Sequence, residues 1–185
     1  RLLILVLSLT LLVTPTLSLG ETAESPFPDH STEIRKNVKA YLDEMDYSYT
    51  YDSENQMFDL IFTMENQLGD VEFIVYVLEN GLSCAGFPEI VVPQENRDKA
   101  AQYIVRVNYD MRYARLDMDW ETGKVNSFMS IPSYDVIPSQ TEIDSLLMFA
   151  YSVLEEYGDG LKECRKMLAM AKAGKRNGYL LEGMG

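Results

Sequence analysis

Few side chains in this 185-residue chain could carry chemistry, and their types exclude the commonest catalytic arrangements. The only histidine, His30, stands in a polar stretch, which excludes a histidine-dependent triad and a site with several histidine ligands. Cys84 has no base at a defined spacing that would activate its thiol. The sequence contains no glycine-rich phosphate-binding loop. We therefore expect a protein that is not an enzyme, with no catalytic residues, no cofactor and no metal.

One acidic row is a candidate calcium site. Asp117, Asp119 and Glu121 alternate with other residues, so a strand would place them on one face. Calcium is bound by several carboxylate oxygens. No loop of alternating ligand residues surrounds the row, however, and we interpret it as a solvated acidic face.

The overall charge restricts the class of partner. The chain has 29 acidic and 16 basic residues, which gives a net charge of −13, and its hydrophobic content of 46% is typical of a globular protein. The basic residues are enriched in residues 161–185, so the preceding part is more acidic still. An acidic surface is repelled by phosphate backbones and by anionic lipid, so a nucleic-acid partner is not expected.

The N-terminal segment indicates export. Residues 2–13 are apolar, and this run is shorter than the ~20 residues that span a bilayer. Pro15 and small residues follow, as at the end of a signal peptide. We predict a signal peptide over residues 1–20, a linker over residues 21–31 and a secreted or cell-envelope protein. The alternative is an uncleaved anchor, and a membrane association is expected only in that case.

The two cysteines of the predicted mature chain, Cys84 and Cys164, allow two interpretations. In an oxidising compartment they could form a disulfide. Nothing in the sequence brings their Cα atoms within the distance of about 7 Å that a disulfide needs, so we favour two free thiols.

Hydrophobic periodicity predicts an α+β protein, with an antiparallel β-sheet and helices packed on it. The expected order is α-β-β-β-β-α-β-β-α. The predicted helices cover residues 32–45, 94–110 and 139–157, and the strands cover residues 47–51, 57–64, 71–78, 82–87 and two segments within 115–131.

Glycines mark the expected turns and ends. Asn80-Gly81 predicts a tight hairpin turn with positive φ, and Gly123 predicts another. Gly158 and Gly160 are expected to break the third helix. We therefore predict one domain over residues 32–160, a basic terminal helix over 161–173 and a disordered tail over 174–185.

A set of short motifs resembles the YbjN family of bacterial proteins. These motifs contain Pro93, Arg97, Asn108, Asp117 and Gly123, to which we assign structural roles. The resemblance covers roughly Ile34 to Tyr157, and it departs from the family where Ala114 replaces a frequent glycine. It implies a sensory or regulatory protein with a fold similar to type III secretion chaperones and a tendency to bind polypeptides. The family has no established catalytic residues, so the resemblance assigns none to this chain.

Aromatic residues provide a candidate binding surface. The chain has 12 tyrosines, 10 methionines and seven phenylalanines, and such side chains suit adaptable peptide recognition. Tyr47, Tyr49 and Tyr51 alternate on one strand and, with Tyr76 and Phe87, could line a groove. In the alternative interpretation, the same rings belong to the core between the sheet and the helices.

The sequence therefore predicts an exported, non-enzymatic domain, chaperone-like or regulatory, that recognises a protein or peptide partner. It could also form a homodimer through a sheet edge or a helix. The alternative is a small-molecule or signal-sensing domain with a pocket between the sheet and the helices, which would need apolar walls and a few convergent polar groups.

Overall fold

The computed structural model of the protein describes residues 27–172, and it describes the side chains of residues 27–164. The predicted signal peptide over 1–20, most of the linker and the predicted disordered tail lie outside the described residues. Within them, the helices and strands follow the predicted order. They are α1 (Ser31–Glu44), β1 (Tyr49–Asp52), β2 (Met57–Thr63), β3 (Asp70–Leu78), β4 (Gly81–Phe87), the short 3₁₀ helix η1 (Gln94–Asn96), α2 (Arg97–Asp110), β5 (Arg115–Met118), β6 (Val125–Pro132) and α3 (Gln140–Lys172).

The six strands form one antiparallel sheet in the order β1-β2-β3-β4-β6-β5. Consecutive hairpins join β1 to β4. The chain then passes through α2 and returns with β6 beside β4, where Cys84 opposes Met129. The sheet and the three helices confirm the α+β class. The pairing of β4 with β6 joins segments that lie far apart in the sequence.

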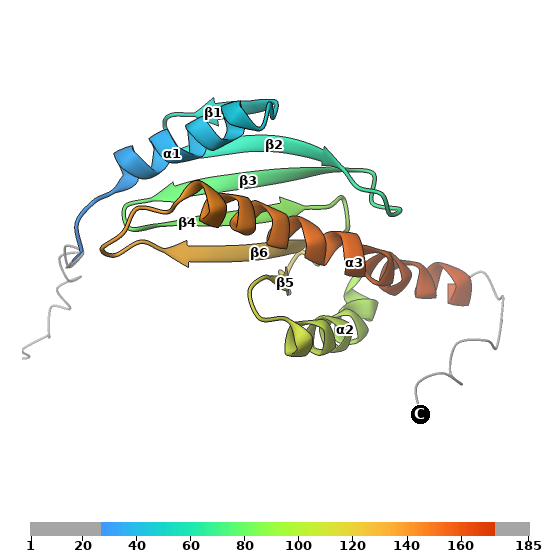
Figure 1. Cartoon of the computed structure of the whole chain (residues 1–185). Helices are drawn as coiled ribbons and strands as arrows, with labels where there is room; N and C mark the ends of the chain where they lie inside the picture. Colours follow the sequence, from blue (N-terminus) through green and yellow to red (C-terminus); the bar gives the residue numbers. More distant parts are fainter. Residues whose placement is uncertain (1–26, 173–185) are drawn as a thin grey trace, which may run out of the picture.

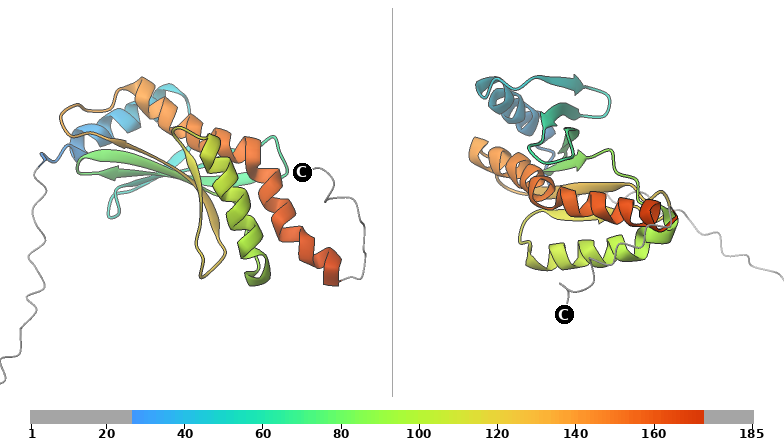
Figure 2. Two further views of the ribbon diagram at one scale, coloured as in Figure 1. Left: turned by 90° about the horizontal axis from the view of Figure 1, so that it is seen from below. Right: turned by 90° about the vertical axis from the view of Figure 1, so that its right-hand side faces the viewer.

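The helices cover one face of the sheet and leave the other open (Figures 1 and 2). Alternate strand residues point towards α1 and α3 and are buried, for example Phe58, Phe73 and Leu82. α3 packs across β4 and β6, and α1 lies beside it over β3. α2 packs against α3 and against β5 at the end of the sheet. No helix of the described residues covers the opposite face.

A glycine allows α3 to approach the sheet closely. A Cβ atom at Gly86 would lie 2.5 Å from the Phe73 ring and 2.8 Å from Leu154 Cδ1. The ring and the leucine side chain therefore fill the space above β4 that a side chain at position 86 would occupy.

The predicted break near Gly158 is wrong, because α3 runs without interruption from Gln140 to Lys172. The predicted third helix and the predicted basic helix over 161–173 are therefore one helix. The two glycines serve packing instead. A Cβ at Gly158 would lie 2.5 Å from Leu68 Cδ1, and one at Gly160 would overlap the ring of Tyr103.

The positive φ predicted for the turn at Asn80-Gly81 is also wrong. In the described part of the chain, positive φ occurs at Asp46, Gln56, Gly69 and Gly123. Gly81 already belongs to β4, where a Cβ atom would lie 2.8 Å from the carbonyl oxygen of Ile131. The close approach of β6, rather than the turn conformation, requires glycine at this position.

Both cysteines are buried free thiols. Burial in the core raises the pKa of the Cys84 thiol to about 12. Burial is also the main cause that raises the pKa of Tyr103 to about 12. Both groups are therefore held in their neutral form in the folded chain.

We expect the free energy of unfolding to fall as the pH rises above about 9, where thiols in an unfolded chain begin to ionise. The sign follows from the raised pKa, because the unfolded chain releases the proton of Cys84 before the folded chain does. Urea unfolding at pH values from 7 to 11 measures this slope. The Cys84→Ala variant should lose stability less steeply between pH 9 and 11, and an unchanged slope would contradict the assignment.

No helix within residues 27–172 combines the length and the apolar composition needed to cross a membrane.

Candidate binding surface

The structure divides the five predicted aromatic residues between the two faces of the sheet. Directly opposed residues of antiparallel strands project to the same face. Tyr49 opposes Leu60 and Tyr51 opposes Phe58, so both tyrosines share the face that carries the core. The five residues therefore do not line one groove.

The three tyrosines around β1 extend the core. The rings of Tyr49 and Tyr51 lie 5.5 Å and 4.6 Å from the ring of Phe58. The Tyr47 ring meets Phe62 edge-on at 5.4 Å. All three are half-buried, so their structure fits the alternative interpretation, in which they belong to the core.

Tyr76 and Phe87 lie on the opposite face. Tyr76 opposes Met57 on one side and Ser83 on the other, and Phe87 opposes Glu72. Both aromatic residues are half-buried by their neighbours. We call this side of the sheet the open face.

The open face has an apolar strip that crosses the sheet from β2 to β6. Ile61 is 71% exposed, and the other members are half-buried. Small residues of β4 form the floor of the strip: Ser83 lies opposite Tyr76 of β3, and Ala85 lies between Ile74 of β3 and Phe128 of β6. The strip consists of Met57, Ile61, Ile74, Tyr76, Phe87 and Phe128.

The charged residues of the strands also project to the open face. The register places every one of them there, five carboxylates and one cation. We call the carboxylates the acidic rim. They are Asp52, Asp59, Asp70, Glu72 and Asp117, and the cation is Arg115.

Arg115, the cation among these strand residues, makes its contacts with other residues of the open face. Arg115 Nε lies 2.9 Å from Asp117 Oδ2. Its guanidinium group lies 4.2 Å from the centre of the Phe128 ring, in a cation–π arrangement. The remaining carboxylates of the rim have no cation from the six strands.

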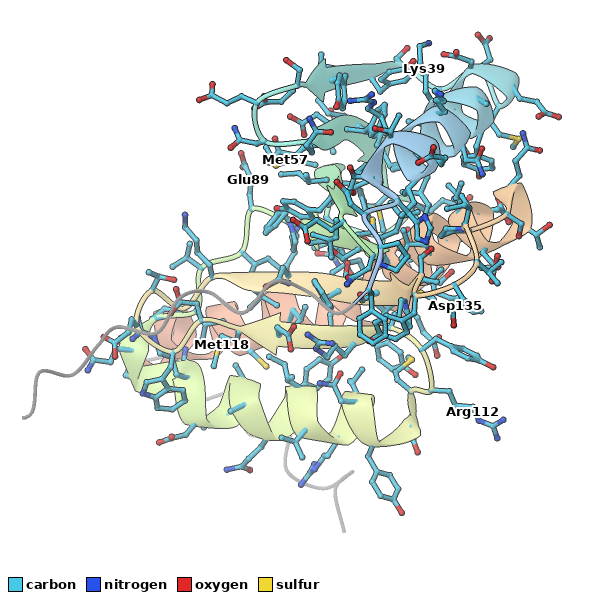
Figure 3. The ribbon with its side chains drawn as sticks, turned by 90° about the vertical axis from the view of Figure 1, so that its left-hand side faces the viewer. Lys39, Met57, Glu89, Arg112, Met118 and Asp135 are labelled. Atoms are coloured by element: carbon cyan, nitrogen blue, oxygen red, sulfur yellow. The ribbon has the colours of Figure 1, made fainter. Side chains whose placement is uncertain are left out.

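Asp59 stands out within the acidic rim. It opposes Ile74 and lies between Met57 and Ile61 on the outward side of β2. Its Oδ1 atom is buried and accepts no hydrogen bond from the described residues. The pKa of the neighbouring Tyr76 is raised, first by burial and then by the negative charges of Asp59 and Glu72. The middle of the strip is therefore electronegative. Figure 3 draws the side chains of the described residues and labels Met57 of the strip and Met118 of β5.

Three of the five motif residues hold the loop before η1 against the β5–β6 hairpin. Arg97 Nη1 donates to the Trp120 carbonyl oxygen at 2.7 Å. Gly123 has a φ of +75°, and its carbonyl oxygen accepts from the Val92 amide at 2.8 Å. Pro93 stands at the N-terminal end of η1. These contacts fix the position of the loop relative to the hairpin, so the role of these residues is structural.

Asn108 has a structural role at the sheet edge. Its Nδ2 donates to the Leu116 carbonyl oxygen at 2.8 Å, and its Oδ1 accepts from the Leu116 amide at 2.8 Å. The side-chain amide thus occupies the backbone groups that another strand would use. This contact was not predicted from the sequence, since it joins two elements across a loop.

The acidic residues Asp117, Asp119 and Glu121 do not share a strand face as expected, because β5 ends at Met118, and they make separate contacts. Asp117 pairs with Arg115, whereas Asp119 Oδ1 accepts from the amides of Glu121 at 2.8 Å and Thr122 at 3.2 Å. Hydrogen bonds from Thr122, followed by that from Glu121, lower the pKa of Asp119. Within the described residues, no group of three potential ligands is placed to hold a metal ion.

A surface hollow of about 250 Å³ lies at the end of β6. Ser133, Tyr134, Asp135 and the first turn of α3 with Glu142 line it. This hollow lies outside the space between the sheet and the helices, where the alternative hypothesis places a small-molecule pocket.

The comparisons with known proteins give the family. Residues 35–163 match the model of the YbjN family, described as "putative bacterial sensory transduction regulator". Because the match covers well over half of the chain, the protein belongs to the YbjN family. The family description is that of a regulator rather than of an enzyme.

Among solved structures, the chain is similar to the crystal structure of YbjN, "a putative transcription regulator from E. coli". The two are 16% identical, with a TM-score of 0.48, and the similarity covers 68% of this chain and 91% of that chain. A comparison with curated proteins found no match.

Proposed function

We propose that this YbjN-family chain is an exported, non-enzymatic regulatory or chaperone-like domain that binds a polypeptide through the open face of its sheet. One observation carries the proposal. An apolar strip with an isoleucine that is 71% exposed crosses a sheet face that no described helix covers. Contiguous apolar patches of this kind mark binding surfaces in soluble proteins.

The two sheet edges are less suited to partner binding than the open face. The edge strands β1 and β5 have only four residues each. Asn108 blocks part of the β5 edge, and charged residues on both edge strands disfavour strand addition. The tyrosines of β1 are engaged with Phe58, and Tyr47, which precedes β1, is engaged with Phe62, so their rings contribute to the core.

A peptide-array screen with matched variants tests the proposal. Ile61→Ser removes the most exposed member of the strip, and Val105→Ser removes an α2 side chain that is 67% exposed on the helix side. We expect the unaltered chain and Val105→Ser to retain the same apolar-containing peptides, and Ile61→Ser to retain them at least tenfold more weakly. Equal retention by both variants would place binding elsewhere.

Export is tested separately. Residues 1–31, preceded by an initiating methionine, are fused to alkaline phosphatase, which becomes active only outside the cytoplasm. Activity of the fusion supports the exported assignment, and loss of that activity when charged residues replace Leu5 and Leu7 provides the control. An inactive fusion would contradict export without affecting the peptide-binding assay.

A further inference from the structure

We propose that the partner of the open face is a cationic amphipathic polypeptide segment, in which lysine or arginine side chains alternate with apolar ones. The inference rests on the proposed function and specifies the chemistry of the partner. The charge of the face, one buried carboxylate oxygen and the dimensions of the strip support it.

The charge of the open face is complementary to a cationic partner. Five carboxylates and one arginine project from the strands, and the arginine is already paired with Asp117. A partner segment with positive charges would meet the carboxylates of β1, β2 and β3, which have no cation from the strands: Asp52, Asp59, Asp70 and Glu72. A second copy of this chain, with its net charge of −13, would instead bring like charges together.

Asp59 provides the most specific point of contact. Its buried Oδ1 atom lacks a hydrogen bond from the described residues, and an unsatisfied buried acceptor is unfavourable. An ammonium or guanidinium group at the strip would supply a donor to it. A charge-assisted hydrogen bond to a carboxylate is stronger than one between neutral groups.

The dimensions of the strip suit a short peptide. From β2 to β6 the strip crosses three strand spacings, roughly 14 Å. That distance corresponds to about four residues of an extended chain. Apolar side chains of such a segment would lie over Ser83 and Ala85, between Tyr76 and Phe128, while its cations reach Asp59 and Glu72.

The test uses the purified chain and three labelled peptides in fluorescence-polarisation titrations. One peptide alternates leucine and lysine, the second alternates leucine and glutamate, and the third alternates serine and lysine. We expect saturable binding of the leucine–lysine peptide, and affinities at least tenfold weaker for the other two. Binding should also weaken as NaCl rises from 50 to 500 mM, because salt screens the charges.

Two double variants with the same change in net charge locate the site. Asp59→Asn/Glu72→Gln removes carboxylates of the open face, and Asp98→Asn/Glu156→Gln removes two exposed carboxylates of α2 and α3. The first should weaken binding of the leucine–lysine peptide at least tenfold, and the second less than twofold. Circular dichroism melting establishes that both variants are folded.

The outcomes that overturn the inference are distinct from failure of the proposed function. If the leucine–glutamate peptide binds equally well and Ile61→Ser abolishes that binding, the open face binds peptides but has no cationic preference. Equal effects of the two double variants would refute the assignment to this face. Self-association that Ile61→Ser abolishes would identify a second copy as the occupant. If no peptide binds, the proposed function fails as well.

Discussion

The Gly123→Ala variant is expected to lose about 2–5 kcal/mol of unfolding free energy, more than most single substitutions. Gly123 has a φ of +75°, a conformation that costs other residues about 1–2 kcal/mol. An added Cβ would also collide with the Val92 carbonyl oxygen, and overpacking of this kind costs about 1–3 kcal/mol. Urea unfolding followed by circular dichroism measures the difference.

Gly69 offers a matched control for this prediction. Its φ is +72°, but no atom lies within 4 Å of the position that a Cβ would take. Gly69→Ala should therefore cost only the conformational part, about 1–2 kcal/mol. Equal losses in the two variants would show that the approach of Val92 to the hairpin contributes nothing.

Removal of the Asn108 side chain is expected to cost about 2–6 kcal/mol of unfolding free energy, the sum for two backbone groups. Asn108→Ala leaves the amide and the carbonyl of Leu116 without their side-chain partners, and each unsatisfied group costs about 1–3 kcal/mol when it stays out of contact with water. The same change leaves the edge of β5 without the side chain that occupies its backbone groups. We therefore also expect association that depends on protein concentration, measured by light scattering.

Tyr109→Ala is the control on the same helix. The Tyr109 side chain is 88% exposed, so its removal should change stability by less than about 0.5 kcal/mol. A comparable loss in both variants would indicate that α2 itself, rather than the contact between Asn108 and Leu116, determines the effect.

Local patterns predicted most of the elements, since each depends on residues close together in the sequence. The alternation of Val71, Phe73, Val75 and Val77 identified β3, and these side chains are buried in the structure. The predicted start of the third helix at residue 139 also agrees with the structure, in which Glu142 Oε2 accepts from the Ser139 amide at 2.8 Å beside the first residue of α3, Gln140.

The features that the sequence did not predict depend on contacts between distant segments. Gly158 and Gly160 suggest a break when read locally, but the space beside them is filled by Leu68 and Tyr103 from other elements. Similarly, the alternation of Tyr47, Tyr49 and Tyr51 predicts that they share a face, without indicating which face α1 covers.

The candidate site was predicted only in part, since Tyr76 and Phe87 belong to the strip but its other members were not named. The predicted binding residues were chosen for their aromatic rings rather than for outward positions on the strands. Asp59 and Ile61 alternate with buried Phe58 and Leu60, and this pattern is a usable signal. The convergence of Asp59 with Tyr76 and Phe128 depends on the strand order, which places β6 beside β4.

The position of α3 at the end of the described chain has a consequence for biosynthesis. A ribosome produces β1 to β6 before the helix that covers β4 and β6. Until residues 140–154 follow, the inner side of the nascent sheet exposes large apolar groups such as Phe73 and Leu82, and such exposure promotes aggregation. Completion of the core is therefore a late event in synthesis, and a chain interrupted before α3 would require protection by a cellular chaperone.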